Sequence, residues 1–441
     1  MHSRLMPGIK DTVTIIVNDE RCKIQKRLLL LNLKELHAQF QQDNPDNSVG
    51  FSTFAKLRPK NCILAGSSGT HSVCVCTIHE NCKLMLEFVN IENVTRNWDT
   101  LVKNYKDCLS VMICKNPTPQ CHLDECDNCP GIDEFCTKLL NSLDEVCISH
   151  VQCISWTGTD RSTLQTVNLK NVDFIDELRT KFQKLKPHSF FAKQQSMFTA
   201  EIKERVCEGE VLVMFDFSEN YAYTVQNASQ AFHFNNDQCT VFPAIYYYLE
   251  NSEIKHKTCV FLSNSLKHDT AAVYSIQVKL IPEIRKSVRN LKKIIYITDG
   301  AKQHFKNRFQ ISNLLHYLED FGVEAEWHYS ATSHGKSGYD GVGATFKRAA
   351  YRASLTAKPK DAILTPEALF KWAKSYFKNI ETFYISKVEY EKMKRKLNKR
   401  FESALPVPEI IKNHAFQVLS VNEIFMKRYS NATEGRRIVL K

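Results

Sequence analysis

The chain has 441 residues, of which 43% are hydrophobic and 24% are charged, and it carries a formal net charge of +11. This length allows about three domains with separate cores. No apolar run approaches the ~20 residues that span a bilayer, and the N-terminus lacks the apolar core of a signal peptide, so we expect no membrane partner.

The charge and the cysteines indicate the class of partner and the compartment. A positive excess of this size is typical of proteins that bind a polyanion such as DNA, although many soluble proteins carry one without doing so. Sixteen cysteines without a secretory signal favour metal binding over disulfides. We therefore expect an intracellular, metal-binding protein of the cytoplasm or nucleus, with the nucleus as the expected compartment if the partner is DNA.

Residues 1–66 contain a candidate DNA-binding region. A strand-like stretch, 11–17, precedes a helical pattern over 26–40, and turn residues separate that pattern from a short helix that Pro59 halts. Ser52 is the expected N-cap of the short helix. This outline is typical of a helix-turn-helix DNA reader, and equally of a small helical hairpin with a basic, solvated end. The candidate DNA contacts are Ser52, Lys56, Arg58 and Lys60.

Residues 67–150 concentrate cysteine. Two polar runs, CVCTIHENC and CKNPTPQCHLDECDNC, have the spacing of zinc half-sites, because thiolates a few residues apart can reach one ion from a tight turn. They predict one or two structural zinc ions, whereas the alternative is a set of buried free thiols. The candidate Zn²⁺ ligands are Cys74, Cys76, His79, Cys114, Cys121, Cys126 and Cys129, with Cys82, Cys108 and Cys136 as candidate bystanders.

Residues 151–205 predict a linker with a basic helical segment. FIDELRTKFQKL has the pattern of an amphipathic helix. KPHSFFAKQQ interleaves basic and aromatic residues, including Lys193, as chains do that follow a nucleic-acid strand. A solvated surface explains this composition nearly as well.

Residues 206–380 carry the clearest pattern. Three strands (211–217, 222–226 and 257–263) come first, followed by a helix, a strand, a helix, a strand and a helix. This is the order of the ribonuclease-H-like α/β fold with a mixed sheet. Asp216 stands at the end of the first strand, Asp299 at the end of the fourth and Asp340 at the start of the last helix. Three converging carboxylates would repel one another unless a divalent cation lay between them. The pattern therefore predicts a metal-binding catalytic triad.

Carboxylate oxygens suit Mg²⁺ or Mn²⁺, and two such ions can activate a water or a 3′-hydroxyl and stabilise the leaving oxygen of a phosphodiester. The glycine-rich segment 332–348 surrounds the third aspartate. It is not a phosphate-binding loop, since Ser330 stands where that loop requires glycine. Its glycines suit a sharp turn into the helix and a close approach by another backbone. The candidate contacts here are His334 and Lys336 for catalysis, and Lys347 and Arg348 for DNA.

Several motifs, DFSENY, LKHDT, TDGAKQHFKN and AEWHYSATSHGKSGYDGVGATFKR, resemble those of DDE-type transposase-like proteins encoded by animal mobile elements. The resemblance extends to KRLLLLNLKELHAQF, CDNCPG and HSFFAKQQS, and so covers about residues 7–380. Relatives usually carry a small residue or cysteine where this chain has Tyr339, and a glycine where it has Ala344; these changes bear on activity more than on fold. The abrupt ends, MHSRLMPG and Lys441, indicate a truncated or decayed copy.

The resemblance implies a metal-dependent enzyme that cuts transposon ends and joins them to target DNA, with a homo-oligomer as the expected assembly. The alternative is a catalytically inactive or domesticated descendant that binds DNA without cutting it. Residues 381–441 predict a basic helix with an apolar docking face, followed by two strands.

Overall fold

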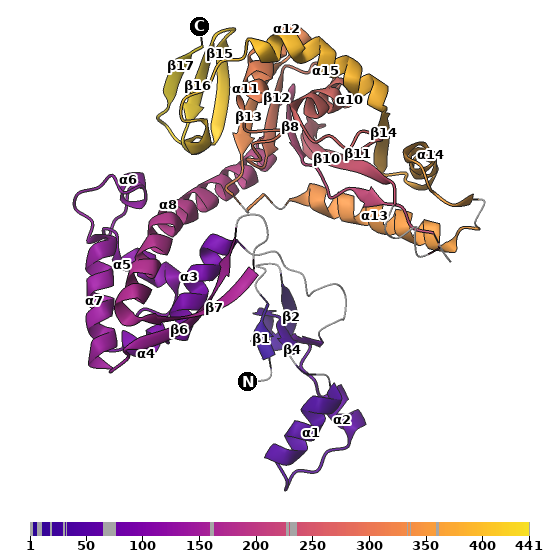
Figure 1. Cartoon of the computed structure of the whole chain (residues 1–441). Helices are drawn as coiled ribbons and strands as arrows, with labels where there is room; N and C mark the ends of the chain where they lie inside the picture. Colours follow the sequence, from indigo (N-terminus) through magenta and orange to yellow (C-terminus); the bar gives the residue numbers. More distant parts are fainter. Residues whose placement is uncertain are drawn as a thin grey trace. The chain divides into compact units, whose positions relative to one another are not determined.

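The computed structural model describes residues 3–6, 11–17, 20–29, 31, 33–64, 76–158, 163–225, 229, 236–332, 334–335, 337–358 and 361–440. The chain divides into two compact units, Met1–Val75 and Cys76–Lys441 (Figure 1). Within the described ranges, no helix has the length and apolar character needed to cross a membrane.

The first unit combines strands with two short helices. Its elements are β1 (Ser3–Leu5), β2 (Thr12–Val17), β3 (Glu20–Gln25), β4 (Arg27–Leu29), α1 (Leu33–Asp43), α2 (Phe51–Lys56) and β5 (Cys62–Leu64). Strands β1, β4 and β5 form a sheet in that order, and β2 and β3 form a hairpin. The helices pack through the rings of His37, Phe40 and Phe54.

Two details of the helix prediction in this unit are wrong. The helix expected over 26–40 begins only at Leu33, because Arg27–Leu29 pairs as β4 between β1 and β5. The N-cap of α2 is Gly50 rather than Ser52, so Ser52 lies inside the helix and is exposed. The predicted pair of helices is therefore present, but it is accompanied by five strands.

The second unit begins with a helical region. Its elements are α3 (Thr77–Phe88), α4 (Ile91–Val94), α5 (Tyr105–Val111), α6 (Pro119–His122), α7 (Gly131–Glu145), β6 (His150–Thr157), β7 (Thr163–Lys170) and α8 (Asn171–Glu204). One apolar core joins α3, α5, α7 and the first half of α8. Cys82, Cys108 and Cys136 are fully buried in this core, where they pack as apolar side chains.

A large mixed sheet follows. Its strands are β8 (Glu210–Phe215), β9 (Tyr221–Ala222), β10 (Gln238–Glu250), β11 (Glu253–Ser263), β12 (Lys293–Thr298), β13 (Glu324–Tyr329), β14 (Ile380–Ile385), β15 (Ala415–Ser420), β16 (Glu423–Lys427) and β17 (Arg436–Val439). The order is β14-β11-β10-β8-β12-β13-β15-β16-β17, and β9 pairs with β10 (Figure 1). Strands β8, β12 and β13 are parallel, whereas β10 runs antiparallel to both of its neighbours, β8 and β11.

Helices cover both faces of the sheet. The alternation of β8 divides its side chains, because successive residues of a strand point to opposite faces. Val211, Val213 and Phe215 meet α10 (Thr270–Ser287), α11 (Arg308–Leu315), α12 (Tyr317–Phe321) and α15 (Lys387–Glu402). Leu212 and Met214 meet the end of α8, and α13 (Gly338–Thr356) with α14 (Pro366–Tyr376) completes that second layer.

The expected element order is present with two differences. The strand expected at 222–226 is reduced to β9, and the main partner of β8 is β10, which the pattern did not indicate. Pro243 interrupts the apolar run of β10, and proline within a run argues against a central strand. The C-terminal strands β15–β17 extend the same sheet through β13 rather than forming a separate region.

Candidate active site and metal centres

Two aspartates meet at one edge of the sheet. Asp216 follows the last residue of β8, and Asp299 follows the last residue of β12. Because β8 and β12 are parallel neighbours, with Met214 paired to Ile297, their carboxyl ends lie side by side. The two carboxylates lie within 4.8 Å of each other and of a His304 ring nitrogen. This edge therefore gathers two oxygen donors and one nitrogen donor.

His304 is a site residue that the sequence did not reveal. It lies in the turn between β12 and α11, and its Nε2 is 3.9 Å from Asp216 Oδ1. Both ring nitrogens are buried without a hydrogen-bond partner in the described part of the chain. The ring centroids of Phe217 and Phe305 lie 4.8 and 4.3 Å from the centroid of the His304 ring. Buried polar atoms normally have partners, so the unpartnered ring beside two carboxylates is a candidate metal ligand.

Asp340 borders the same site from α13. Its carboxylate accepts a hydrogen bond from the Ser337 N–H at 2.8 Å, which caps the helix. Asp340 is outside the 4.8 Å group, but it lines one polar depression together with Asp216, Tyr339 and Lys347. The third aspartate is thus at the start of the last helix, where the sequence predicted it.

The glycines of segment 332–348 bring this helix close to the aspartate strands. A Cβ on Gly335 would lie 3.3 Å from Asp299 Cβ, and one on Gly343 would lie 3.2 Å from the ring of Pro243. A Cβ on Gly341 would meet nothing within 4 Å. Close approach between the segment and the sheet therefore depends on Gly335, Gly338 and Gly343, since a Cβ on Gly338 would lie only 2.8 Å from Ile245 Cδ1 of β10.

The negative charges of the carboxylates alter the pKa of their neighbours. Burial first, and then the negative charge of Asp216, raises the pKa of Asp299 above its ordinary value, and Asp340 adds to the effect. A raised carboxylate pKa marks a site where negative charge is poorly compensated by the protein itself. A divalent cation would compensate it, which makes this edge a candidate centre for a cation with oxygen ligands.

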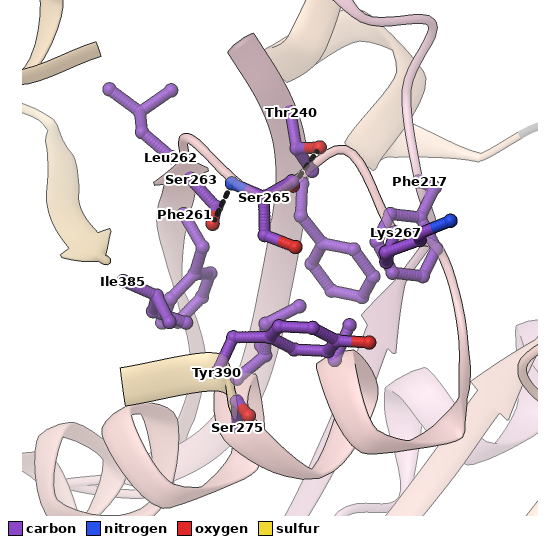
Figure 2. A pocket seen from close by; sticks show the side chains of 13 residues that line it. Phe217, Thr240, Phe261, Leu262, Ser263, Ser265, Lys267, Ser275, Ile385 and Tyr390 are labelled. Carbon is purple, nitrogen blue, oxygen red and sulfur yellow. Dashed lines mark hydrogen bonds between the residues drawn. The ribbon is translucent and has the colours of Figure 1, made fainter. Parts of the chain in front are cut away.

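An apolar pocket lies beside the carboxylate edge (Figure 2). Phe217, Phe261 and Ile385 line it together with Tyr390 of α15. Its rim is fixed where the Thr240 hydroxyl donates a hydrogen bond to a backbone carbonyl at 2.8 Å. Phe217 also contacts His304, so one side chain forms a wall of the pocket and a border of the carboxylate edge.

Four predicted zinc ligands converge in the segment between α5 and α7. The sulfurs of Cys114, Cys121, Cys126 and Cys129 all lie within 4.8 Å of one another, and Cys114 is 3.9 and 3.7 Å from Cys126 and Cys129. Tetrahedral zinc with Zn–S bonds of ~2.3 Å places sulfurs roughly 3.8 Å apart. Hydrogen bonds from Thr118 lower the pKa of Cys121 to about 6, which favours the thiolate that binds metal.

A second cluster combines Cys76 and His79 with two histidines from elsewhere, His188 of α8 and His334 of the segment before α13. His334, a candidate catalytic contact, thus lies with these ligands. Cys82, the last cysteine of the CVCTIHENC run, is in the apolar core instead. The candidate ligand Cys74 and the candidate catalytic residue Lys336 lie outside the described residues.

The candidate DNA contacts are in several places. Ser52, Lys56, Arg58 and Lys60 are exposed on the first unit. In the second unit Lys193 is exposed on α8 and Arg348 on α13, whereas Lys347 donates a hydrogen bond to the Glu219 carbonyl at 3.1 Å.

The basic helix α15 is held against the sheet layer. Tyr390 and Leu397 are buried against neighbouring helices, as the predicted docking face requires. Arg400 forms hydrogen bonds of 2.6 and 2.9 Å with the carboxylate of Asp320.

These features define a mixed α/β protein with a carboxylate–histidine cluster at a sheet edge and two clusters of cysteine and histidine that could hold metal. The chain belongs to the family described as a domain of unknown function, DUF8701, whose model matches residues 195–430. Two further families, also described as domains of unknown function, match residues 77–186 (DUF8700) and 1–66 (DUF8699).

Comparison with characterised proteins adds little. No curated protein matches the chain. Among solved structures, the crystal structure of the Mos1 strand transfer complex matches with 13% identity and a TM-score of 0.26, over 76% of this chain and 97% of that chain.

Proposed function

We propose that the second unit is a ribonuclease-H-like polynucleotidyl transferase of the DDE type, which cuts and joins DNA strands with Asp216, Asp299 and Asp340. The observation that carries the proposal is the meeting of Asp216 and Asp299 at the ends of adjacent parallel strands. Asp340 borders the same depression from the start of α13.

The strand order supports this assignment. A ribonuclease-H-like sheet places its first three strands as an antiparallel meander and adds the fourth and fifth in parallel beside the first. Here the meander is β8, β10 and β11, and β12 and β13 follow on the other side of β8. Catalytic carboxylates in such a sheet belong at the ends of the first and fourth strands and on the last helix, which are the positions of the three aspartates.

The donor set fits Mg²⁺ or Mn²⁺, because carboxylate oxygens suit hard cations and Mn²⁺ also accepts an imidazole. Such ions, when bound, would polarise the phosphate and activate the attacking water or 3′-hydroxyl. Asp216 and Asp299 would hold them, and His304 would complete the donor set from the turn. Asp340 would join from α13, whose first turn the Ser337 cap holds in place.

The other parts of the chain have supporting roles in this proposal. The first unit would contact DNA through Lys56, Arg58 and Lys60, and Lys193 and Arg348 would contact it in the second unit, because basic side chains on an accessible surface bind phosphate. Cys114, Cys121, Cys126 and Cys129 would bind one structural Zn²⁺. An enzyme that cuts and joins transposon ends would act in the nucleus. Binding two ends at the same time would favour a homo-oligomer.

A nicking assay with the full chain tests the proposal. The substrate is a supercoiled plasmid that carries intact element ends, with Mg²⁺ or Mn²⁺ added. We expect divalent-metal-dependent cleavage at the ends, and a loss on the order of a hundredfold or more in Asp216→Asn and Asp299→Asn. Glu208→Gln, an exposed carboxylate at the opposite end of β8, is the matched control and should cleave normally.

Three other outcomes have distinct meanings. Cleavage without preference for element ends would identify a general nuclease of the same fold. DNA binding without cleavage at intact ends, with either metal, would identify the inactive or domesticated descendant. Unchanged cleavage in both aspartate variants would overturn the assignment of the site.

A further inference from the structure

We propose that Cys76, His79, His188 and His334 bind one Zn²⁺ ion, and that this ion fastens the segment leading into α13 to helices α3 and α8. The four ligand atoms lie within 4.8 Å of one another. They come from three separate parts of the sequence, and three of the four are imidazoles. Their combination is therefore a property of the folded chain rather than of a sequence motif.

The separations suit a tetrahedral ion. His188 Nε2 is 3.2 Å from His334 Nε2 and 3.2 Å from Cys76 Sγ. Zinc bonds of ~2.0–2.1 Å to nitrogen and ~2.3 Å to sulfur place such ligand atoms roughly 3.4–3.6 Å apart. The observed distances are close to these values, so a small outward movement of the side chains would admit the ion.

The cluster also leaves a donor atom without a partner. His79 Nδ1 is buried and makes no hydrogen bond within the described part of the chain. The rings of His79, His188 and His334 lie 5.0–5.1 Å from one another, centre to centre. A buried, unpaired nitrogen in a group of three facing imidazoles is costly unless something binds it, and a zinc ion would satisfy all three rings together.

Three parts of the chain hold the four ligands. Cys76 is the N-cap of α3, and His79 is three residues later on the first turn, so both face one side of the helix start. His188 is in the middle of α8, directly after Pro187. His334 precedes α13. Four protein ligands complete a tetrahedron and leave no open position, which is the arrangement of a structural zinc rather than a catalytic one.

The consequence for the proposed active site is positional. Five residues separate His334 from Asp340, and among them Gly335 lies against Asp299. An ion that holds His334 would therefore fix the path of the segment past Asp299 and the start of the helix that carries Asp340. This consequence depends on the proposed function, whereas zinc binding does not. His334 becomes a positioning residue in place of the catalytic contact that the sequence suggested.

Zinc content of the purified full chain tests the binding. We expect two zinc ions per chain, one at the four-cysteine cluster and one here. His334→Ala and His188→Ala should each retain one, and His256→Ala, which removes an exposed imidazole on β11, should retain two. Circular dichroism confirms that each variant folds. Two zinc ions in both His188→Ala and His334→Ala would overturn the proposal.

Two further measurements distinguish the ligands and the consequence. In cobalt-substituted protein, His334→Cys should restore the second ion and increase the thiolate-to-cobalt absorbance, since this site would then have two sulfurs; restored binding without that increase would contradict ligation by residue 334. Nicking by His334→Ala should fall on the order of tenfold to a hundredfold and recover in His334→Cys. Loss of zinc with unchanged nicking would refute the positional role and leave the zinc site standing, whereas an inactive wild-type chain that retains two zinc ions would refute only the proposed function.

Discussion

His304 differs from the aspartates beside it because its surroundings are aromatic. Phe217 and Phe305 contact the ring on two sides, yet both ring nitrogens are unsatisfied in the described part of the chain. We predict that His304→Phe retains the packing and loses the nitrogen donor. The variant should unfold at a similar urea concentration to the wild type, but bind Mn²⁺ about 10–100-fold more weakly by calorimetry.

The same substitution at His256, which is exposed on β11, serves as the control. It should change neither property. Equal Mn²⁺ affinity in His304→Phe and the wild type would mean that His304 serves only to fill space between the two phenylalanines.

Lys306, two residues further, makes stability depend on pH. Its ammonium is buried and donates a hydrogen bond to the Ile411 carbonyl at 3.0 Å. Burial lowers the pKa of Lys306 to about 8, below the ~10.4 of a lysine in an unfolded chain. The unfolded chain therefore binds more protons between these values, and the free energy of unfolding rises with pH across that interval, by on the order of 2–3 kcal/mol from this group.

We predict that Lys306→Met removes this rise. The measurement is urea unfolding of the wild type and of Lys306→Met at about pH 7 and at about pH 10. At each pH the free energy of unfolding of the variant is subtracted from that of the wild type, which cancels the titration of other groups. The difference should move in favour of the wild type at the higher pH. A constant difference would contradict a lowered pKa.

At the scale of elements, α13 offers two glycines with opposite surroundings. Gly343 faces the ring of Pro243 in β10, whereas Gly341 faces open space. Valine has the same helix propensity at both positions, so the difference between Gly343→Val and Gly341→Val isolates the packing of α13 on the sheet. We expect Gly343→Val to be less stable than Gly341→Val by about 1–3 kcal/mol in urea unfolding.

A valine at position 343 that pushes α13 away from Pro243 should also affect the proposed site. Because Asp340 is one turn before Gly343, Gly343→Val should lower nicking, and Gly341→Val should not. Equal stability of the two variants would show that α13 moves away from β10 without cost.

The elements also show which features a sequence pattern can predict. Asp216 and Asp299 could be predicted because each ends an apolar strand, and strand order then places those ends together. Strand β10 was missed because Pro243 interrupts it, and β9 was overestimated. His188 and His334 could not be recognised as ligands, since neither has a partner nearby in the sequence, and their proximity depends on the packing of α8 beside the segment before α13.

At the scale of the whole molecule, the second unit depends on its C-terminal strands. Strand β15 pairs with β13 through Trp327 and Phe416, which are both fully buried. Gln195 of α8 ties the same region together, because its amide donates to the Tyr329 carbonyl at 2.7 Å and to the Ser430 hydroxyl at 2.8 Å. The family match over residues 195–430 has the same extent as this group of contacts.

We therefore predict that residues 206–380, the catalytic core expected from the sequence, do not fold alone. That fragment would expose Trp327 and the edge of β13, and unpaired edges with apolar surface aggregate. The full chain should elute as a defined species from a sizing column and melt cooperatively by circular dichroism. The fragment should elute in the void volume or show no cooperative melting. A fragment that remained soluble and melted cooperatively would mean that β8, β10–β13 and their helices bury enough surface without β15–β17, and that the C-terminal strands are an addition to the fold rather than a part of its core.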